Sequence, residues 1–92
     1  MNVNGQRIVI TGVGAISPNG IGRERYFESV QRGISGIRPI SFFDANELPS
    51  RVAGEVREFD PGEWIDPKQL KHVSRTVPMV LAASSEALAD AG

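Results

Sequence analysis

The sequence has 92 residues, of which 40% are hydrophobic and 23% charged, and its formal net charge is -1. This composition indicates a single soluble globular unit, and the balanced charge argues against nucleic acid or an anionic membrane as a partner. Cysteine is absent, which excludes disulfides, thiolate metal sites and a cysteine nucleophile within these residues. The start resembles no signal peptide and no apolar run reaches about 18 residues, so we expect a cytoplasmic protein.

The first predicted element is a strand over residues 7–11, "RIVIT". Its β-branched residues are apolar on both faces, which indicates a central strand covered on both sides, as in a layered α/β fold. Residues 12–22, "GVGAISPNGIG", follow and contain four glycines and one proline. Such a composition predicts a loop.

The next predicted element is an amphipathic helix over residues 23–33, "RERYFESVQRG". Tyr26, Phe27 and Val30 share one face, while arginines and glutamates occupy the other. Gly33 suits a left-handed C-cap, so the helix is expected to end there.

Residues 33–50 are predicted to be irregular, because glycines and prolines interrupt every apolar run. Phe42 and Phe43 are nevertheless expected to be buried. Residues 51–56, "RVAGEV", predict a short edge strand, which Gly54 weakens.

A short helix is predicted from Pro67 to about Val73. Asp66 is placed to cap it, Pro67 suits its first position, and Gln69 stands where a capping box places its return bond.

The last predicted helix begins near Thr76, because Pro78 lacks an N–H and is best tolerated in a first turn. The small residues of 82–89, "AASSEALA", allow another backbone to approach closely. Helical spacing predicts an apolar-to-small buried face of Val77, Val80, Leu81, Ser84, Ala87 and Leu88.

The glycine loop fails as a nucleotide-binding motif. A dinucleotide site needs G-x-G-x-x-G; Gly12 and Gly14 supply the first two members, but Ser17 stands at the third and Pro18 follows. No G-K-S or G-K-T of a P-loop exists. The spacing favours a glycine turn that lets the chain cross closely packed backbone.

Several motifs in this order resemble the amino-terminal part of β-ketoacyl-acyl carrier protein synthases, the condensing enzymes of fatty acid and polyketide synthesis. The motifs are "VITGVGAISPNG", "GISGI", "FD", "AGEV" with "FDP", and the closing "ALADAG". The similarity runs from about Gln6 to Gly92, and five linked motifs are more specific than one glycine loop.

This resemblance implies a thiolase-like α-β-α-β-α layered α/β fold, incomplete here, with residues 1–92 as its amino-terminal fragment. It implies a 3-oxoacyl-[acyl-carrier-protein] synthase, an acyltransferase that joins an acyl thioester to malonyl-carrier protein by decarboxylative Claisen condensation. Such enzymes are usually homodimers and need no metal or other cofactor.

The family's nucleophilic cysteine and two histidines lie beyond the region that resembles this chain. The only histidine, His72, falls where the family keeps no catalytic histidine and is expected at the surface. No catalytic residue is therefore assigned within the 92 residues, and the chain by itself is expected to be inactive.

The resemblance also implies acyl carrier protein as a partner. In the family, basic side chains near this short helix dock the acidic carrier, and Lys68, Lys71 and His72 fall on positions that are often basic. Spacing alone favours a merely solvated helix face. The rival hypothesis is a small noncatalytic binding module that uses the Gly12 to Gly20 loop for a phosphate or the 68–75 segment for a protein.

Overall fold

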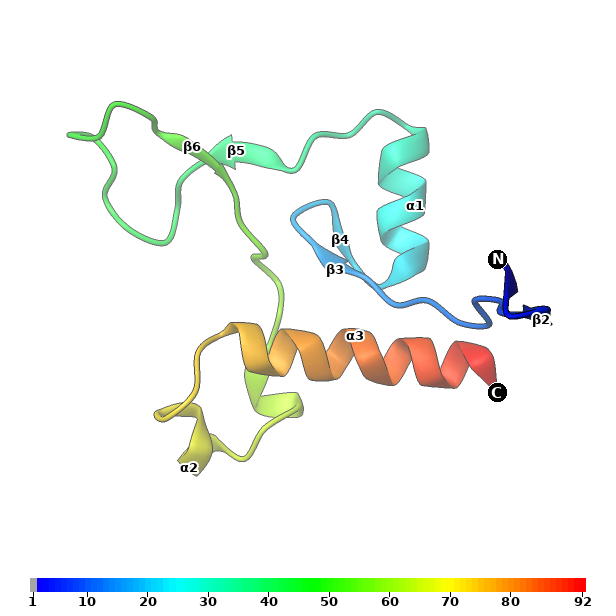
Figure 1. The fold of residues 1–92 in the computed structure, drawn as a ribbon. Helices are drawn as coiled ribbons and strands as arrows, with labels where there is room; N and C mark the ends of the chain where they lie inside the picture. The colour runs from blue at the N-terminus through cyan, green and yellow to red at the C-terminus, as the bar shows by residue number, and fades with distance from the viewer. Residues whose placement is uncertain (1) are drawn as a thin grey trace.

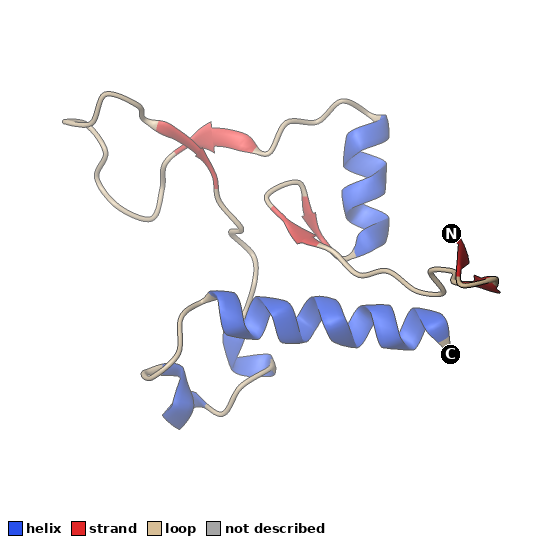
Figure 2. Ribbon diagram, viewed as in Figure 1, coloured by secondary structure: helices blue, strands red, loops and turns tan. Residues whose placement is uncertain are grey.

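The computed structural model describes residues 2–92, and their side chains from residue 4 onward. One long helix, α3 (Thr76–Ala91), extends across the molecule, and the other elements lie around it (Figures 1 and 2). The remaining helices are α1 (Arg23–Gln31), the single-turn 3-10 helix η1 (Pro61–Glu63) and the short α2 (Pro67–Leu70).

The described strands are two or three residues long and pair antiparallel in three separate ribbons. The ribbons are β1 (Asn2–Val3) with β2 (Gln6–Arg7), β3 (Ile16–Ser17) with β4 (Gly20–Ile21), and β5 (Ile37–Pro39) with β6 (Val52–Gly54). The first ribbon turns at Asn4 and Gly5, which both have positive φ, as the favoured two-residue hairpin turn requires. This hairpin was not predicted from the sequence.

The helix starts were predicted correctly. α1 begins after Gly22, and Gly33 ends its C-terminal turn with a φ of 68°. The Asp66 carboxylate accepts the Lys68 N–H at 2.9 Å and so caps α2, as predicted, although α2 ends at Leu70 rather than near Val73. α3 begins at Thr76, which places Pro78 in its first turn.

The predicted central strand over residues 7–11 is wrong for this structure. Only Arg7 is paired, within β2, and residues 8–11 have no ladder partner among the described residues. Ile8, Val9 and Ile10 are exposed, Ile10 by 80%. The pattern is that of an inner strand, but the described residues supply no neighbouring strand to pair with it.

Two segments predicted to be irregular contain strands. Within the predicted loop 12–22, Pro18 and Asn19 turn the β3–β4 ribbon, and the Asn19 N–H donates to the Ser17 hydroxyl. Within 33–50, residues 37–39 form β5, the partner of the edge strand predicted at 51–56. Both ribbons are too short to show a period-2 pattern.

Two predictions of burial are also wrong. Phe42 and Phe43 are 56% and 59% exposed. On α3 the predicted apolar face lies open, with Leu88 73% exposed, whereas Pro78 and Ala82 are buried. α3 therefore packs on its small residues, and its larger apolar side chains find no cover within the described residues.

Candidate functional site

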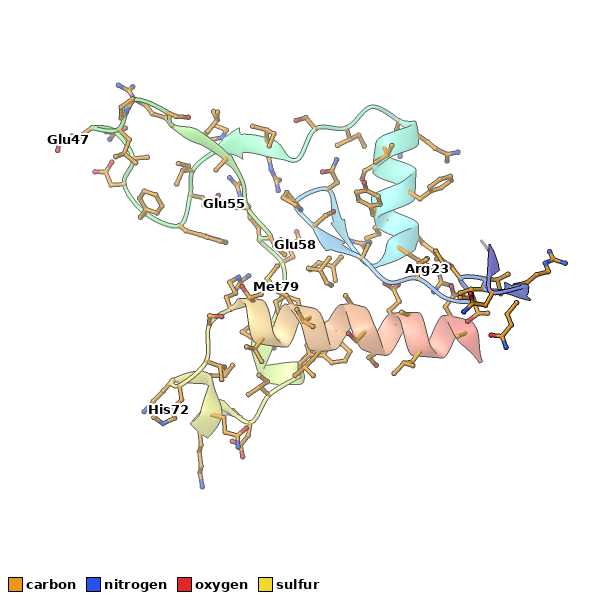
Figure 3. The ribbon with its side chains drawn as sticks, viewed as in Figure 1. Arg23, Glu47, Glu55, Glu58, His72 and Met79 are labelled. Atoms are coloured by element: carbon orange, nitrogen blue, oxygen red, sulfur yellow. The ribbon has the colours of Figure 1, made fainter. Side chains whose placement is uncertain are left out.

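The three side chains predicted to bind a partner lie together at the surface. Lys68 is in α2, Lys71 is its C-cap and His72 follows in the turn, and all three residues are exposed. Figure 3 shows His72 beside α2, on the side of the molecule away from the chain termini. We call Lys68, Lys71 and His72 the basic patch. Within residues 4–92, the side chains of the basic patch make no hydrogen bond or salt bridge.

A second candidate site, the glycine loop, is held by two carboxylates of α3. Glu86 accepts hydrogen bonds from the backbone N–H of Ala15 at 3.0 Å and of Arg23 at 3.0 and 3.1 Å. Asp90 accepts from the Val13 N–H at 3.1 Å and pairs with the Arg23 guanidinium at 3.1 Å. Glu86 thereby caps the N-terminus of α1, where its negative charge interacts favourably with the helix dipole.

These contacts argue against a phosphate in the loop. The N–H groups of Val13 and Ala15 already donate to the carboxylates of Asp90 and Glu86, so they are not available to a phosphate. The glycines instead allow close packing: a Cβ on Gly12 or Gly14 would overlap the carbonyl oxygens of Ala87 or Ala83 on α3. The predicted close backbone approach to the small residues of this helix is confirmed.

A substitution at Gly14 tests this packing. We expect Gly14→Ala, made in the whole protein, to destabilise it by about 1–3 kcal/mol, because the new methyl meets rigid backbone of α3. Gly62→Ala is the matched control, since its nearest neighbour is the flexible Asp60 carboxylate at 3.1 Å, and its cost is expected within about 0.5 kcal/mol. Chemical denaturation compares the two, and equal midpoints would contradict the close-packing role.

A third cluster surrounds Glu55, which is only 8% exposed and lies just after β6 (Figure 3). Its carboxylate accepts the backbone N–H groups of Ser41 at 3.0 Å and Phe42 at 3.1 Å, and the Ser41 hydroxyl at 3.0 Å. Arg57 pairs with it at 3.0 Å and also donates to the Pro39 carbonyl. Burial raises the pKa of Glu55, but the hydrogen bonds from Ser41, Phe42 and Arg57 together outweigh burial and leave it below its usual 4.5.

This lowered pKa predicts a pH dependence of stability. A carboxyl group whose pKa is lower in the folded state stabilises above its unfolded pKa of 4.5 and loses that effect as pH falls through its folded pKa. Between about pH 6 and about pH 3, the whole wild-type protein should therefore lose more stability than Glu55→Gln, whose side chain does not titrate. Denaturation midpoints across this range measure the difference, and parallel curves would contradict the assignment.

Two surface grooves flank the β3–β4 ribbon. A polar groove of about 640 Å³ lies against α1, and a smaller apolar one of about 330 Å³ lies against α3. Neither described lining includes a histidine, so neither groove offers an imidazole base. Among residues 2–92, no group of three His, Asp or Glu side chains is arranged for a metal ion. None of the described helices is long and apolar enough to span a bilayer.

The sequence analysis missed Glu86, Asp90 and Glu55. Glu86 and Asp90 are four residues apart, which places both on one face of α3, and this spacing beside small residues was the available signal. Glu55 lies within the "AGEV" motif, but nothing in the local pattern distinguishes this glutamate from an exposed residue of an edge strand. Its partners Ser41 and Phe42 lie about 14 residues earlier in the chain and contact it only in the fold.

Comparison with known protein families gives one match across nearly the whole chain. The family model described as Beta-ketoacyl synthase, N-terminal domain, matches residues 5–92. This range includes the glycine loop, the basic patch and α3.

Individual relatives agree with the family match. The chain is 38% identical over 90 residues to 3-oxoacyl-[acyl-carrier-protein] synthase 2 of Synechocystis sp., covering 98% of this chain and 22% of that protein. It is 37% identical over 87 residues to the chloroplastic 3-oxoacyl-[acyl-carrier-protein] synthase II of Arabidopsis thaliana, covering 95% and 16%. A solved ishigamide ketosynthase/chain length factor superposes with a TM-score of 0.77 at 40% identity, covering 91% and 21%. The chain thus spans about a fifth of the length of its relatives.

Proposed function

The chain belongs to the β-ketoacyl synthase family, and from this premise we propose that residues 1–92 are the amino-terminal part of a 3-oxoacyl-[acyl-carrier-protein] synthase of fatty acid or polyketide biosynthesis. The observation that carries the proposal is the match of the family's N-terminal domain to residues 5–92, supported by the superposition on a ketosynthase. From the family resemblance we also infer a cytoplasmic homodimer.

The proposed reaction is a decarboxylative Claisen condensation. A cysteine thiolate takes the acyl group from its thioester and releases the carrier thiol; malonyl-carrier thioester loses carbon dioxide, and the resulting carbanion attacks the acyl-enzyme carbonyl. A carbon–carbon bond forms and the thiolate is released. We place the cysteine and two assisting histidines outside residues 1–92, which contain no cysteine. The 92 residues then contribute scaffold and docking surface rather than reacting atoms.

The scaffold role is supported by the contacts of α3. Glu86 and Asp90 join the glycine loop, the start of α1 and α3 into one unit. We propose that residues 8–11 are an inner strand of a layered thiolase-like sheet and that other sequence covers them. Their β-branched, two-faced apolar pattern and present exposure support this assignment.

We propose that the basic patch of Lys68, Lys71 and His72 docks the carrier protein. Their exposure supports an encounter with an acidic carrier protein, because charges at the rim of an interface attract a partner of opposite sign and accelerate association. A solvated helix face without a partner has the same exposure. The two possibilities differ in how charge reversal affects carrier-dependent turnover.

The direct test uses the whole reading frame that contains these residues. Purified protein is supplied with acyl-carrier and malonyl-carrier thioesters, and 3-oxoacyl product and released carbon dioxide are measured. We expect both to form in equal amounts, since each condensation releases one carbon dioxide. If neither forms while the carriers bind normally, the chain belongs to a noncatalytic relative and the proposal fails.

A further inference from the structure

One arginine outside the basic patch joins three segments of the chain. The Arg75 guanidinium donates to the Val56 carbonyl at 2.8 Å. Its central carbon lies 5.6 Å from the ring centroid of Phe42 and also 5.6 Å from that of Phe59, within range of a cation–π interaction with both rings. Arg75 is the N-cap residue of α3, so these contacts tie the start of this helix to the segment that follows β6.

These contacts close the base of a loop that carries the basic patch. The chain leaves Phe59, passes through η1 and α2, and returns at Arg75 (Figure 1). Phe59 is buried, so the loop is closed against a fixed point of the fold. Among the described residues, the backbone hydrogen bonds of residues 66–72 join partners within that stretch. No backbone hydrogen bond in the part of the chain that the structure describes therefore ties α2 to the rest of the fold, and the contacts at the two ends of the loop contribute to its placement.

We propose that Arg75 is a positioning residue for the carrier, an inference that rests on the proposed function. Arg75 holds the 59–75 loop so that Lys68, Lys71 and His72 present one docking face. Arginine suits this position because its planar guanidinium stacks on aromatic rings while its N–H groups donate to a carbonyl. Lysine keeps the charge but lacks the flat face and the fixed fork of donors. A role through charge alone would therefore survive Arg75→Lys, and a role through geometry would not.

The experiment compares Arg75→Lys with wild type in the whole protein. We expect the KM for acyl-carrier thioester to rise about fivefold, because contacts that order the loop are lost, with kcat unchanged. Turnover of a small carrier-free thioester should stay within about twofold of wild type. Amide hydrogen exchange of residues 61–73 should accelerate. Arg32→Lys is the matched control, since Arg32 is exposed at the C-cap of α1 and forms its salt bridge with Glu28, one turn earlier.

The outcomes distinguish this inference from the docking proposal on which it depends. If Arg75→Lys retains the wild-type KM for the carrier thioester, or lowers both activities equally, the positioning role is overturned. Lys68→Glu with Lys71→Glu is measured in the same assay. If that pair raises the carrier KM while Arg75→Lys does not, only the role of Arg75 fails; if neither has an effect, docking by the basic patch fails as well.

Discussion

Residues 1–92, produced alone, are expected to show no cooperative unfolding transition. Their accessible surface is 7180 Å², whereas a compact chain of 9.9 kDa exposes about 5,200 Å². The radius of gyration is 16.7 Å, against about 12 Å for a compact domain of this length. The chain thus buries too little surface to offset the conformational entropy of ordering its backbone.

The exposed surface includes many large apolar side chains. Ile8, Val9 and Ile10 are exposed on a segment with no ladder partner, and Val80 and Leu88 are exposed on α3. The described ribbons have two strands of two or three residues each, and an isolated two-stranded hairpin is at best marginally stable in water. We therefore expect the isolated chain to be molten or aggregated.

The measurements are thermal denaturation, amide chemical-shift dispersion and binding of a hydrophobic dye. The whole protein is the control and should unfold cooperatively without binding the dye. A sharp transition of the 92-residue chain at the sedimentation coefficient of a monomer would contradict the expectation, and with it the view that other sequence covers these faces.

Reversing the charge of the basic patch should cause the second large effect. We expect Lys68→Glu with Lys71→Glu to lower kcat/KM for carrier-bound substrates about tenfold, because each change removes an attraction and adds a repulsion of about 0.5–1 kcal/mol. Turnover of a small carrier-free thioester should be unchanged, since these exposed side chains lie at the surface. The loss should diminish at high salt, which screens exposed charges.

The matched control carries the same change of charge elsewhere. Arg7→Glu with Arg51→Glu alters two exposed arginines outside α2 and should leave carrier-dependent turnover near wild type. A comparable loss in the control would indicate a general effect of net charge. If both activities fell together in the Lys68 and Lys71 variant, the docking assignment would be wrong.

The local helical elements could be predicted because their signals are confined to a few neighbouring residues. Asp66 and Pro67 start α2, Pro78 fits only the first turn of α3, and Gly33 ends α1. The linked motifs indicate the family, because their order and spacing carry more information than any one loop. The presence of Ser17 where a dinucleotide motif needs its third glycine also indicated correctly that the loop serves packing.

Burial and pairing could not be predicted in the same way. The exposure of Phe42 and of the large apolar residues of α3 depends on which partners are present, and sequence periodicity marks only a face that favours burial. Likewise, the pattern of residues 7–11 indicates an inner strand, but a strand forms only when another chain segment completes its ladder.

The sequence by itself determined the family, through the order of its motifs, and the helix starts, through capping and short-range sterics. It also determined the surface position of Lys68, Lys71 and His72, because polar and charged side chains of this kind are costly to bury. Only the tertiary structure decided that Glu86 and Asp90 hold the glycine loop, that Glu55 accepts the backbone N–H groups of Ser41 and Phe42, and that Arg75 closes the loop carrying the basic patch. Those contacts join residues about 14 to 77 positions apart, and their geometry depends on the path of the whole chain.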